Sequence, residues 1–327
     1  MSGRCRHCAH PAAQGRTDGG PHGVSDRVGS VTRSVLLLAH TGREAATVAA
    51  REVVARLQGA GVQVRMLAEE AAETGLPDVA VCDAGPGSAA GAELVLVLGG
   101  DGSILRAAEL ARAAAVPLLG VNLGRVGFLA EAESADLDHT LDRLLERDYS
   151  VEQRMTLDVT VVVDGQLVDR GWALNECSVE KSMRERMLEL VVEIDGRPLS
   201  RWGCDGVVMA TPTGSTAYAF SAGGPVVWPT VEAVMVVPIS AHALFARPLV
   251  VAPSSVVAVE VLPSGTTGVI ACDGRRTKAL PHGARVEIRR GCDPVLLARM
   301  QDRPFTDTLV RKFALPVEGW RGAAEQG

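Results

Sequence analysis

The first half of the chain alternates continuous apolar runs with segments of helical spacing, and this alternation limits the possible folds more than any other feature. The clearest run, residues 93–98 (ELVLVL), is apolar at nearly every position. Strands of this kind are buried on both faces, as in a parallel sheet covered by helices. The sequence therefore predicts an α/β domain. Its expected strands cover residues 34–40, 62–67, 79–81, 93–98 and 116–122, and its expected helices cover residues 43–60 and 103–115.

The pattern changes near Tyr149, where β-branched and alternating segments replace the continuous runs. Asp195-Gly196 is a strong hairpin turn between two such segments. We expect an all-β, sandwich-like domain with strands at residues 156–163, 188–194, 256–262, 268–272 and 285–290. Phe305, Leu309 and Phe313 share one face of a short helix that would dock on another surface. The expected order is an extension (1–33), the α/β domain (34–149), the β-rich domain (150–292) and a segment (293–327) that packs back on the α/β domain.

The first 33 residues are rich in Gly, Pro, Arg and His and lack an apolar face, so we expect a disordered extension. A group of possible zinc ligands lies in this segment: Cys5, His7, Cys8 and His10. No second pair of such ligands follows downstream, which favours an adventitious cluster over a zinc site. Seven cysteines in a long chain argue against a disulfide framework. The segment has no apolar core of a secretory signal, and no apolar run approaches about 18 residues. These features predict a cytoplasmic protein that does not enter a membrane.

Composition also limits the partners and the kinds of phosphate site. The net charge of −6 gives no basic footprint for nucleic acid. The only lysines are Lys181, Lys278 and Lys312, and no G-x-x-x-x-G-K-[ST] motif is present, which excludes a P-loop. Gly85, Gly87 and Ala90 match a dinucleotide fingerprint, but they run into a strand and not into a helix, so a turn is expected there. Any phosphate must be neutralised by Arg, a metal ion or backbone amides.

A glycine loop, Gly99-Gly100-Asp101-Gly102, lies between the clearest strand and a helix. Ligands of parallel sheets bind at the carboxyl ends of the strands, where this loop falls, and residues without Cβ let the backbone approach an anion. The plain alternative is that the glycines end the strand and Asp101 caps the helix. Arg106, one turn later, could screen a phosphate or lie solvated on the helix face.

A second segment, residues 205–221 (DGVVMATPTGSTAYAFS), combines hydroxyl groups, small residues and one aromatic ring. Such a segment suits hydrogen bonds to ribose and phosphate, with Tyr218 available to a base. It could also be an ordinary turn that leads into a capped helix. Asn175-Glu176, a polar pair at a strand end, would by itself more often be a loop.

These motifs together resemble the NAD kinase family, from Val35 to Arg321, and most closely its actinobacterial members. The resemblance rests on GGDGSILRAAE, NLGRVGFLAE, LNECSVEK, CDGVVMATPTGSTAYAFSAGGPVVWP and PISAHALFARPLVV, in the order and spacing of the family. It implies an enzyme that phosphorylates the 2′-hydroxyl of the adenosine ribose of NAD, using ATP with Mg²⁺. The donor range that it implies extends to polyphosphate. It also implies a homo-oligomer, either a dimer or a tetramer.

The resemblance assigns roles to individual residues. Asp101 matches the proton acceptor and so the catalytic residue, and no residue is assigned to a metal. The region after the second-domain Cys-Asp, Cys272-Asp273-Gly274-Arg275, matches a further ligand contact. Residues implied to bind the nucleotides are Gly99, Gly100, Gly102, Arg106, Asn175, Glu176, Arg186, Asp205, Thr216, Ala217, Tyr218, Ala219, Phe220 and Ser221.

Two other functions remain open on the residues alone. A different GGDG kinase, acting on a lipid or a sugar, shares the glycine loop but does not explain Asn175-Glu176 together with residues 216–221. A catalytically silent NAD(P)-binding regulator would resemble the chain closely but would have no use for an acidic residue at position 101.

Overall fold

The computed structural model describes residues 33–40, 42, 44–124, 127–133, 136–300 and 304–317. They lie in one compact unit that begins at Arg33. The predicted extension, with Cys5, His7, Cys8 and His10, lies outside the described residues. Arg33, which the sequence grouped with it, is anchored: its guanidinium donates to Glu93 Oε1 and Oε2 at 2.8 and 2.9 Å and to the Leu145 carbonyl at 2.8 Å.

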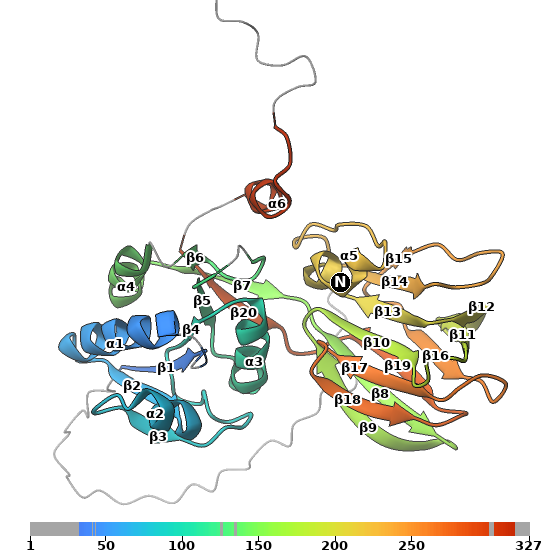
Figure 1. The fold of residues 1–327 in the computed structure, drawn as a ribbon, viewed down its shortest axis with the longest axis horizontal. Helices are drawn as coiled ribbons and strands as arrows, with labels where there is room; N and C mark the ends of the chain where they lie inside the picture. Colours follow the sequence, from blue (N-terminus) through green and yellow to red (C-terminus); the bar gives the residue numbers. More distant parts are fainter. Residues whose placement is uncertain are drawn as a thin grey trace, which may run out of the picture. The chain divides into compact units, whose positions relative to one another are not determined.

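The first part of the chain forms the predicted α/β domain around a mostly parallel sheet (Figure 1). Its strand order is β3-β2-β1-β4-β5-β20-β7, with β6 paired to β5, and only the β20–β7 pairing is antiparallel. The strands are β1 (Ser34–Ala39), β2 (Gln63–Leu67), β3 (Ala80–Cys82), β4 (Leu94–Leu98), β5 (Leu118–Asn122), β6 (Ala132–Glu133), β7 (Ser150–Arg154) and β20 (Val295–Arg299).

Helices cover both faces of this sheet, which explains why its strands are apolar at successive positions. The helices are α1 (Glu44–Gly59), α2 (Ala68–Thr74), α3 (Asp101–Ala111), the short η1 (Arg112–Ala114) and α4 (Leu137–Glu146). Leu96 and Leu98 of β4 pack in one core with α1 and α4. Val95 and Val97 of the same strand pack in a second core with α3. Both faces are therefore buried, as continuous apolar strands require.

The second part of the chain forms two six-stranded antiparallel sheets, as the sandwich-like prediction requires. The first has the order β15-β14-β13-β10-β17-β18 and the second the order β12-β11-β16-β19-β8-β9. The strands are β8 (Leu157–Val163), β9 (Gln166–Ala173), β10 (Glu176–Lys181), β11 (Leu188–Ile194), β12 (Arg197–Cys204), β13 (Gly206–Ala210), β14 (Val234–Ile239), β15 (Leu249–Val251), β16 (Val257–Val261), β17 (Gly268–Cys272), β18 (Arg276–Leu280) and β19 (Arg285–Arg290).

Alternate residues of these strands meet in one core between the two sheets. Val207 and Met209 of β13 contribute to it from the first sheet, and residues such as Trp202 and Val259 contribute from the second. The opposite face of β13, Val208 and Ala210, packs under the short helix α5 (Tyr218–Ser221), which follows the 3₁₀ turn η3 (Thr213–Thr216). The Asp195-Gly196 turn joins β11 to β12 with positive φ angles of 52° and 73°, as the hairpin prediction expects.

One strand differs from the sequence prediction in the sheet that it joins. Strand β7, which the predicted boundary at residue 150 placed with the β-rich domain, pairs with β20 in the α/β sheet. Strand β20 belongs to the segment 293–327, for which packing on the α/β domain is expected, and it lies parallel to β5. The α/β sheet is therefore completed by a strand from near the C-terminal end of the described chain.

Helix α6 (Phe305–Phe313) has the predicted bounds and contacts both parts of the structure. The Phe128 ring of the α/β domain lies 6.0 Å from the Phe305 ring, and the Phe220 ring of the β domain stacks on Phe313 at 4.8 Å. Trp228 meets Phe305 edge to face at 5.1 Å. In the described part of the chain, no helix is long and apolar enough to cross a membrane.

Candidate active site

The GGDG loop lies at the carboxyl ends of the parallel strands, between β4 and α3. Gly100 is the N-cap of α3 and its carbonyl accepts hydrogen bonds from the amides of Ser103 and Ile104 at 2.9 and 3.2 Å. A Cβ on Gly99 would lie 2.3 Å from Ser103 Oγ, so this turn requires glycine there. The sequence placed the start of the helix two residues later, because it assigned the whole glycine run to the turn.

Asp101 is the first residue of α3, and its side chain does not cap that helix, whose N-cap has no side-chain hydrogen bond. Its carboxylate oxygens instead accept hydrogen bonds from the amides of Phe128 and Leu129, each at 3.0 Å. A Cβ on Gly127 would lie 2.2 Å from Asp101 Oδ1, so only glycine leaves room for the carboxylate. The loop after β5 thus fixes the orientation of Asp101, and the capping alternative is wrong.

A cavity of about 980 Å³ opens beside this loop. Its walls come from the ends of β1, β4 and β5, from α3 and, across the cavity, from Arg275 after β17. The lining residues include His40, Glu70, Gly100, Gly102, Ser103, Arg106, Asn122 and Arg275. Three of the residues predicted to bind nucleotide line this cavity: Gly100, Gly102 and Arg106.

Arg106 is paired and not solvated. Its guanidinium donates to Glu70 Oε1 at 2.7 Å, and Glu70 Oε2 accepts the amide of Ala39 at 2.9 Å. Burial raises the pKa of Glu70, while the hydrogen bond from Ala39 and the charge of Arg106 act in the opposite direction. The pair holds Arg106 at the cavity wall, with about a third of its side chain exposed. No sequence pattern indicates a role for Glu70, which lies in α2, a helix that is not predicted.

The Asn175-Glu176 pair is held in place by a buried aspartate. Asp273 accepts hydrogen bonds from the amides of Leu174 at 3.0 Å and of Asn175 at 2.7 Å. A Cβ on Gly214 would lie 2.0 Å from the Asn175 carbonyl oxygen, so η3 packs directly on this strand end. Residues 174–176, 211–216 and 273–276 therefore form one compact cluster, although they come from distant parts of the sequence.

This cluster contains two buried oxygen atoms without a hydrogen-bond partner, Asn175 Oδ1 and Glu176 Oε2. Burial, and secondarily the charge of Asp273, raises the pKa of Glu176 to about 7, although the amide of Tyr218 lowers it. Buried polar atoms are nearly always paired, and leaving one unpaired costs about 1–3 kcal/mol. Two such atoms on adjacent residues point to a ligand with hydrogen-bond donors, such as ribose hydroxyl groups.

The segment from Thr216 to Ser221 continues from this cluster along α5. Tyr218 donates from its hydroxyl to Glu180 Oε2 at 3.2 Å, and burial together with Glu180 raises the pKa of Tyr218 to about 12. Within α5, Ala219 faces the core and is buried, whereas the Phe220 ring stacks on Phe313 of α6. Thr216 ends η3, Ala217 is the N-cap of α5 and Ser221 is the last residue of α5. Thr216 Oγ1 donates to the Thr213 carbonyl at 3.4 Å.

Asp205 and Arg186 lie outside the cluster formed by residues 174–176, 211–216 and 273–276. Asp205 is half exposed and pairs with Lys181 at 2.6 Å, which lowers the pKa of its carboxyl. Its charge also contributes to the raised pKa of Tyr218, so it lies near that ring. Arg186 is exposed in the turn after β10, and in the described part of the chain it forms no hydrogen bond or ion pair.

Contacts between the domains bring the two halves of the site together. Arg275 and Arg276, after the Asp273-Gly274 turn, reach Glu109 of α3 at 3.2 and 3.5 Å. Arg276 also pairs with Asp273 at 2.6 Å and lies over the Trp172 ring at 4.4 Å. Since α3 begins at Asp101, these contacts place the turn that supports Asn175 against the helix that carries the GGDG loop. The sequence indicated this turn only through the Cys-Asp-Gly-Arg stretch.

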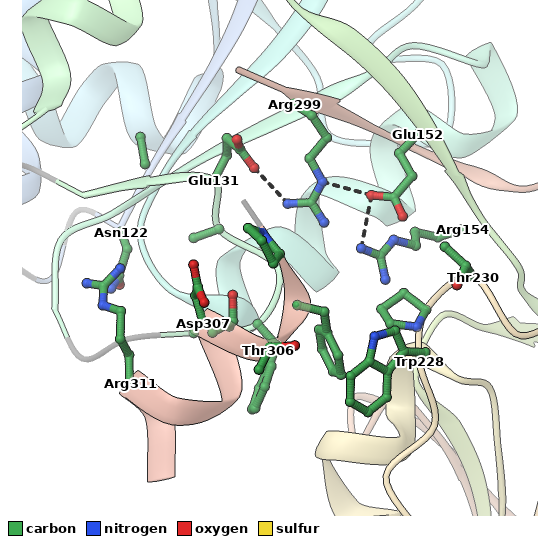
Figure 2. Close-up of a pocket in the computed structure, with 18 of the residues that line it drawn as sticks. Asn122, Glu131, Glu152, Arg154, Trp228, Thr230, Arg299, Thr306, Asp307 and Arg311 are labelled. Carbon is green, nitrogen blue, oxygen red and sulfur yellow. Dashed lines mark hydrogen bonds and ion pairs between the residues drawn. The ribbon is translucent and has the colours of Figure 1, made fainter. Parts of the chain in front are cut away.

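A second cavity, of about 540 Å³, lies between β7, β20, residues 228–230 and α6 (Figure 2). Its polar wall is a network in which Arg299 donates to Glu131 and Glu152, both at 2.8 Å, and Arg154 donates to Glu152 at 3.0 Å. None of the residues predicted from the sequence to bind nucleotide lines it. The GGDG cavity is therefore the candidate active site.

Comparisons with known proteins identify the family of the chain. The chain matches the family model for the ATP-NAD kinase N-terminal domain over residues 35–149 and that for the C-terminal domain over residues 174–300. It is 63% identical to an NAD kinase of Thermobifida fusca, over 92% of this chain and 97% of that protein. It is 55% identical to an NAD kinase of Rhodococcus erythropolis, over 89% of this chain and 96% of that protein.

Solved structures show the same fold. Yeast NADH kinase, solved with NADH, superposes with a TM-score of 0.78 at 22% identity, covering 88% of this chain and 89% of that one. An NAD kinase of Archaeoglobus fulgidus, solved with ATP, superposes with a TM-score of 0.65 at 24% identity, covering 87% and 100%. On the two family models and the close relatives, the chain belongs to the NAD kinase family.

Proposed function

We propose that this chain, as an NAD kinase, transfers a phosphoryl group from ATP to the 2′-hydroxyl of the adenosine ribose of NAD, with Asp101 as the catalytic residue. The observation that carries the residue assignment is the pair of unpartnered, buried oxygen atoms of Asn175 and Glu176. They lie in the cluster that Arg275 and Arg276 join to the helix of Asp101. Ribose hydroxyl groups are the donors that such oxygens lack.

Asp101 would accept the proton of the 2′-hydroxyl. Each of its carboxylate oxygens accepts one backbone amide and keeps a lone pair for a further donor. Phosphoryl transfer depends mainly on positioning and on charge stabilisation, because its transition state is loose. A carboxylate fixed by two amides suits the orientation of an alcohol, and it would take up the proton late in the reaction.

The donor phosphates would occupy the GGDG cavity, which Gly100 and Gly102 line. Gly99 would act by shaping the turn, because its own amide donates to the Val121 carbonyl at 3.0 Å. Arg106 and Arg275 line its walls and would neutralise part of the phosphate charge. Mg²⁺ would be held mainly by the donor phosphates, where it would neutralise charge, and no side chain is assigned to it.

NAD would be held by the second half of the site. Asn175 and Glu176 would bind the ribose, and Thr216, Ala217, Tyr218 and Ser221 would supply the surface for the adenosine. Ala219 would support this surface from below, because it is buried in the core under α5. Asp205 and Arg186 would contact the outer part of the dinucleotide. Phe220 would contribute indirectly, because its ring packs on α6 and holds α5 in place.

Three further properties belong to the same proposal. The donor range is wide and extends to polyphosphate, because contacts to phosphate oxygens do not distinguish nucleobases. The protein acts in the cytoplasm. It assembles as a homo-oligomer, a dimer or a tetramer, which sedimentation at several protein concentrations would test.

The function is tested by incubating the full chain with NAD, Mg²⁺ and ATP, GTP, CTP or polyphosphate, and by measuring initial rates of NADP formation. The proposal expects NADP with every nucleoside triphosphate. NADP with ATP alone would overturn the wide donor range. Bound NAD without NADP would identify a silent NAD-binding protein, and phosphorylation of a lipid or a sugar in place of NAD would identify a different GGDG kinase.

A further inference from the structure

Two cysteines face each other across neighbouring strands directly behind the Asn175-Glu176 cluster. Cys177 of β10 and Cys272 of β17 are register partners in the antiparallel ladder. The next pair along, Glu176 and Asp273, is joined by a hydrogen bond from the Asp273 amide to the Glu176 carbonyl at 2.9 Å. The cysteines therefore occupy a non-hydrogen-bonded position, where the Cα atoms lie about 4.5 Å apart. That separation falls within the range of about 4.4–6.8 Å found for disulfides.

The two side chains lie in the same core between the sheets, and each thiol shifts the pKa of the other. The neighbouring Cys177 thiol, together with the charge of Arg276, lowers the pKa of Cys272. The neighbouring Cys272 thiol and burial raise the pKa of Cys177. The pair is thus asymmetric, and Cys272 is the member that more readily forms the reactive thiolate.

A small oxidant has a route to Cys272. A cavity of about 230 Å³ lies between β8, β9, β17 and β18 and is lined by Cys272, Gly171 and the exposed residues Arg170 and Thr277. A Cβ on Gly171 would lie 3.6 Å from Cys272 Sγ, in ordinary van der Waals contact. The absence of a side chain at Gly171 therefore leaves the sulfur open toward this cavity. Strands β9 and β18 are edge strands, so the cavity lies at the open side of the sandwich.

The position of the pair connects it to the active site. Cys177 directly follows Asn175-Glu176, and Cys272 directly precedes Asp273, which holds the amides of Leu174 and Asn175. We propose that Cys177 and Cys272 form a reversible disulfide when exposed to a peroxide, and that this bond weakens NAD binding. A disulfide draws the sulfur atoms closer than thiols in contact and so displaces the strand ends that carry the NAD-binding residues. The effect on NAD rests on the proposed function, whereas formation of the disulfide does not.

The chemistry balances with peroxide as the oxidant. The Cys272 thiolate attacks one peroxide oxygen, the O–O bond breaks, and a sulfenic acid forms with loss of one water after protonation. Cys177 sulfur then attacks the Cys272 sulfur, the S–S bond forms, the S–O bond breaks, and a second water leaves with the thiol proton. Two thiols lose two electrons and peroxide becomes two waters. A dithiol reductant reverses the step by exchange.

The test begins with the full chain treated with hydrogen peroxide, followed by alkylation of free thiols and peptide mass spectrometry. The proposal expects a linked peptide that contains Cys177 and Cys272 and that disappears after treatment with dithiothreitol. Cys177→Ala and Cys272→Ala should each abolish it. Cys204→Ala is the matched control, because Cys204 lies in the same core but is paired with Leu188. Free or over-oxidised Cys177 and Cys272, or a link to another cysteine, would overturn the proposal.

Gly171→Ala tests the access route. The added methyl group closes the space above Cys272 Sγ without a steric clash, so the linked peptide should form several times more slowly at the same peroxide concentration. Gly87→Ala, a substitution into open space far along the chain, serves as the control. An unchanged rate of oxidation in Gly171→Ala would contradict the route.

The coupling to the site is measured by NAD titration and by NADP formation before and after oxidation. We expect the KM for NAD to rise about three- to tenfold and to return after reduction, less than the roughly 100-fold cost of a 1 Å misplacement. Cys177→Ala should show no such response to peroxide. An unchanged KM in protein that carries the disulfide would refute the coupling. If reduced protein formed no NADP, the proposed function would fail while the peptide analysis still decided the disulfide.

Discussion

At the scale of single residues, the unpartnered oxygens of Asn175 and Glu176 separate this strand end from an ordinary loop. Their neighbours are satisfied: Thr211 Oγ1 donates to the Leu174 carbonyl at 2.6 Å and the Thr211 amide to the Asn175 carbonyl at 2.9 Å. The backbone of the cluster is therefore complete, and only the side-chain oxygens that would face a ligand are left without donors.

The raised pKa of Glu176 gives a testable dependence on pH. Its carboxyl has a pKa of about 7 in the folded chain against a usual value of 4.5, so its stabilising contribution is present below about pH 4.5 and is lost as the pH rises through 7. Glu176→Gln removes this titration. Relative to the unchanged protein, the variant should gain about 1–3 kcal/mol in free energy of unfolding between about pH 5 and pH 8, measured by urea denaturation. Glu260→Gln on β16 is the control, and equal gains in both variants would contradict the assignment.

Asp205 and Tyr218 belong to the part of the site that would bind NAD and not the donor. Asp205→Ala and Tyr218→Ala should therefore raise the KM for NAD and leave kcat nearly unchanged, as expected when a contact is equally strong in the ground and transition states. Initial rates over a range of NAD concentrations, together with calorimetric titration, would measure this. Unchanged NAD affinity in both variants would remove these residues from the site.

Several residue contacts could not be predicted from the sequence, because they join positions far apart in it. The partners of the Asp101 carboxylate lie 27 and 28 residues away, and Glu70 lies 36 residues from Arg106. Local spacing identified Asp101 and Arg106 as polar residues near a glycine loop. It carried no information on the side chains and amides that hold them.

At the scale of elements, the packing of η3 on the end of β9 and β10 sets the geometry of the NAD side. Gly214→Ala would place a Cβ 2.0 Å from the backbone oxygen of Asn175, which cannot move aside as a flexible side chain could. We expect a loss of about 1–3 kcal/mol in stability and a higher KM for NAD. Thermal unfolding and initial rates measure both. Gly87→Ala, which meets open space, should change neither, and a Gly214→Ala variant of normal stability and KM would refute the packing argument.

Elements with a strong apolar pattern could be predicted, and those without one could not. The bounds of β11 and α6 agree with prediction at both ends, because alternation or helical spacing marks them clearly. Strand β7 (SVEQR) is a polar edge strand, and α2 (AEEAAET) has no apolar stripe, so neither gives a periodic signal. Helix α4 is not among the predicted helices, although its spacing of Leu137, Leu141 and Leu144, which are buried on one face, is a signal that could have identified it.

At the scale of the whole molecule, the return of β20 to the α/β sheet joins the two ends of the described chain. The segment 293–327 is expected to pack on the α/β domain, but no local pattern predicts that Val295–Arg299 does so as a strand of its sheet, because it follows sandwich strands of similar composition. The fold class followed from the periodicity of each half. The way in which the halves meet depends on Arg275, Arg276 and Glu109, which are ordinary charged residues in the sequence.

The sequence makes one prediction for the N-terminal extension. Deletion of residues 1–31 should leave the melting temperature and the rate of NADP formation unchanged, because the segment has no apolar face with which to pack. The truncated chain keeps Arg33 and its contacts with Glu93. A fall of several degrees in melting temperature, or stoichiometric zinc in the purified full chain, would contradict this expectation.

The central claim is that Asp101 accepts the proton of the NAD hydroxyl, and Asp101→Asn tests it most directly. The substitution keeps the shape of the side chain and removes its charge and basicity. The measurement is kcat for NADP formation together with the NAD dissociation constant, with Asp164→Asn in the exposed β8–β9 turn as the matched control. We predict that kcat falls by roughly 10²–10⁴-fold while NAD affinity changes little, and that the control is unaffected. Near-normal kcat in Asp101→Asn would contradict the assignment.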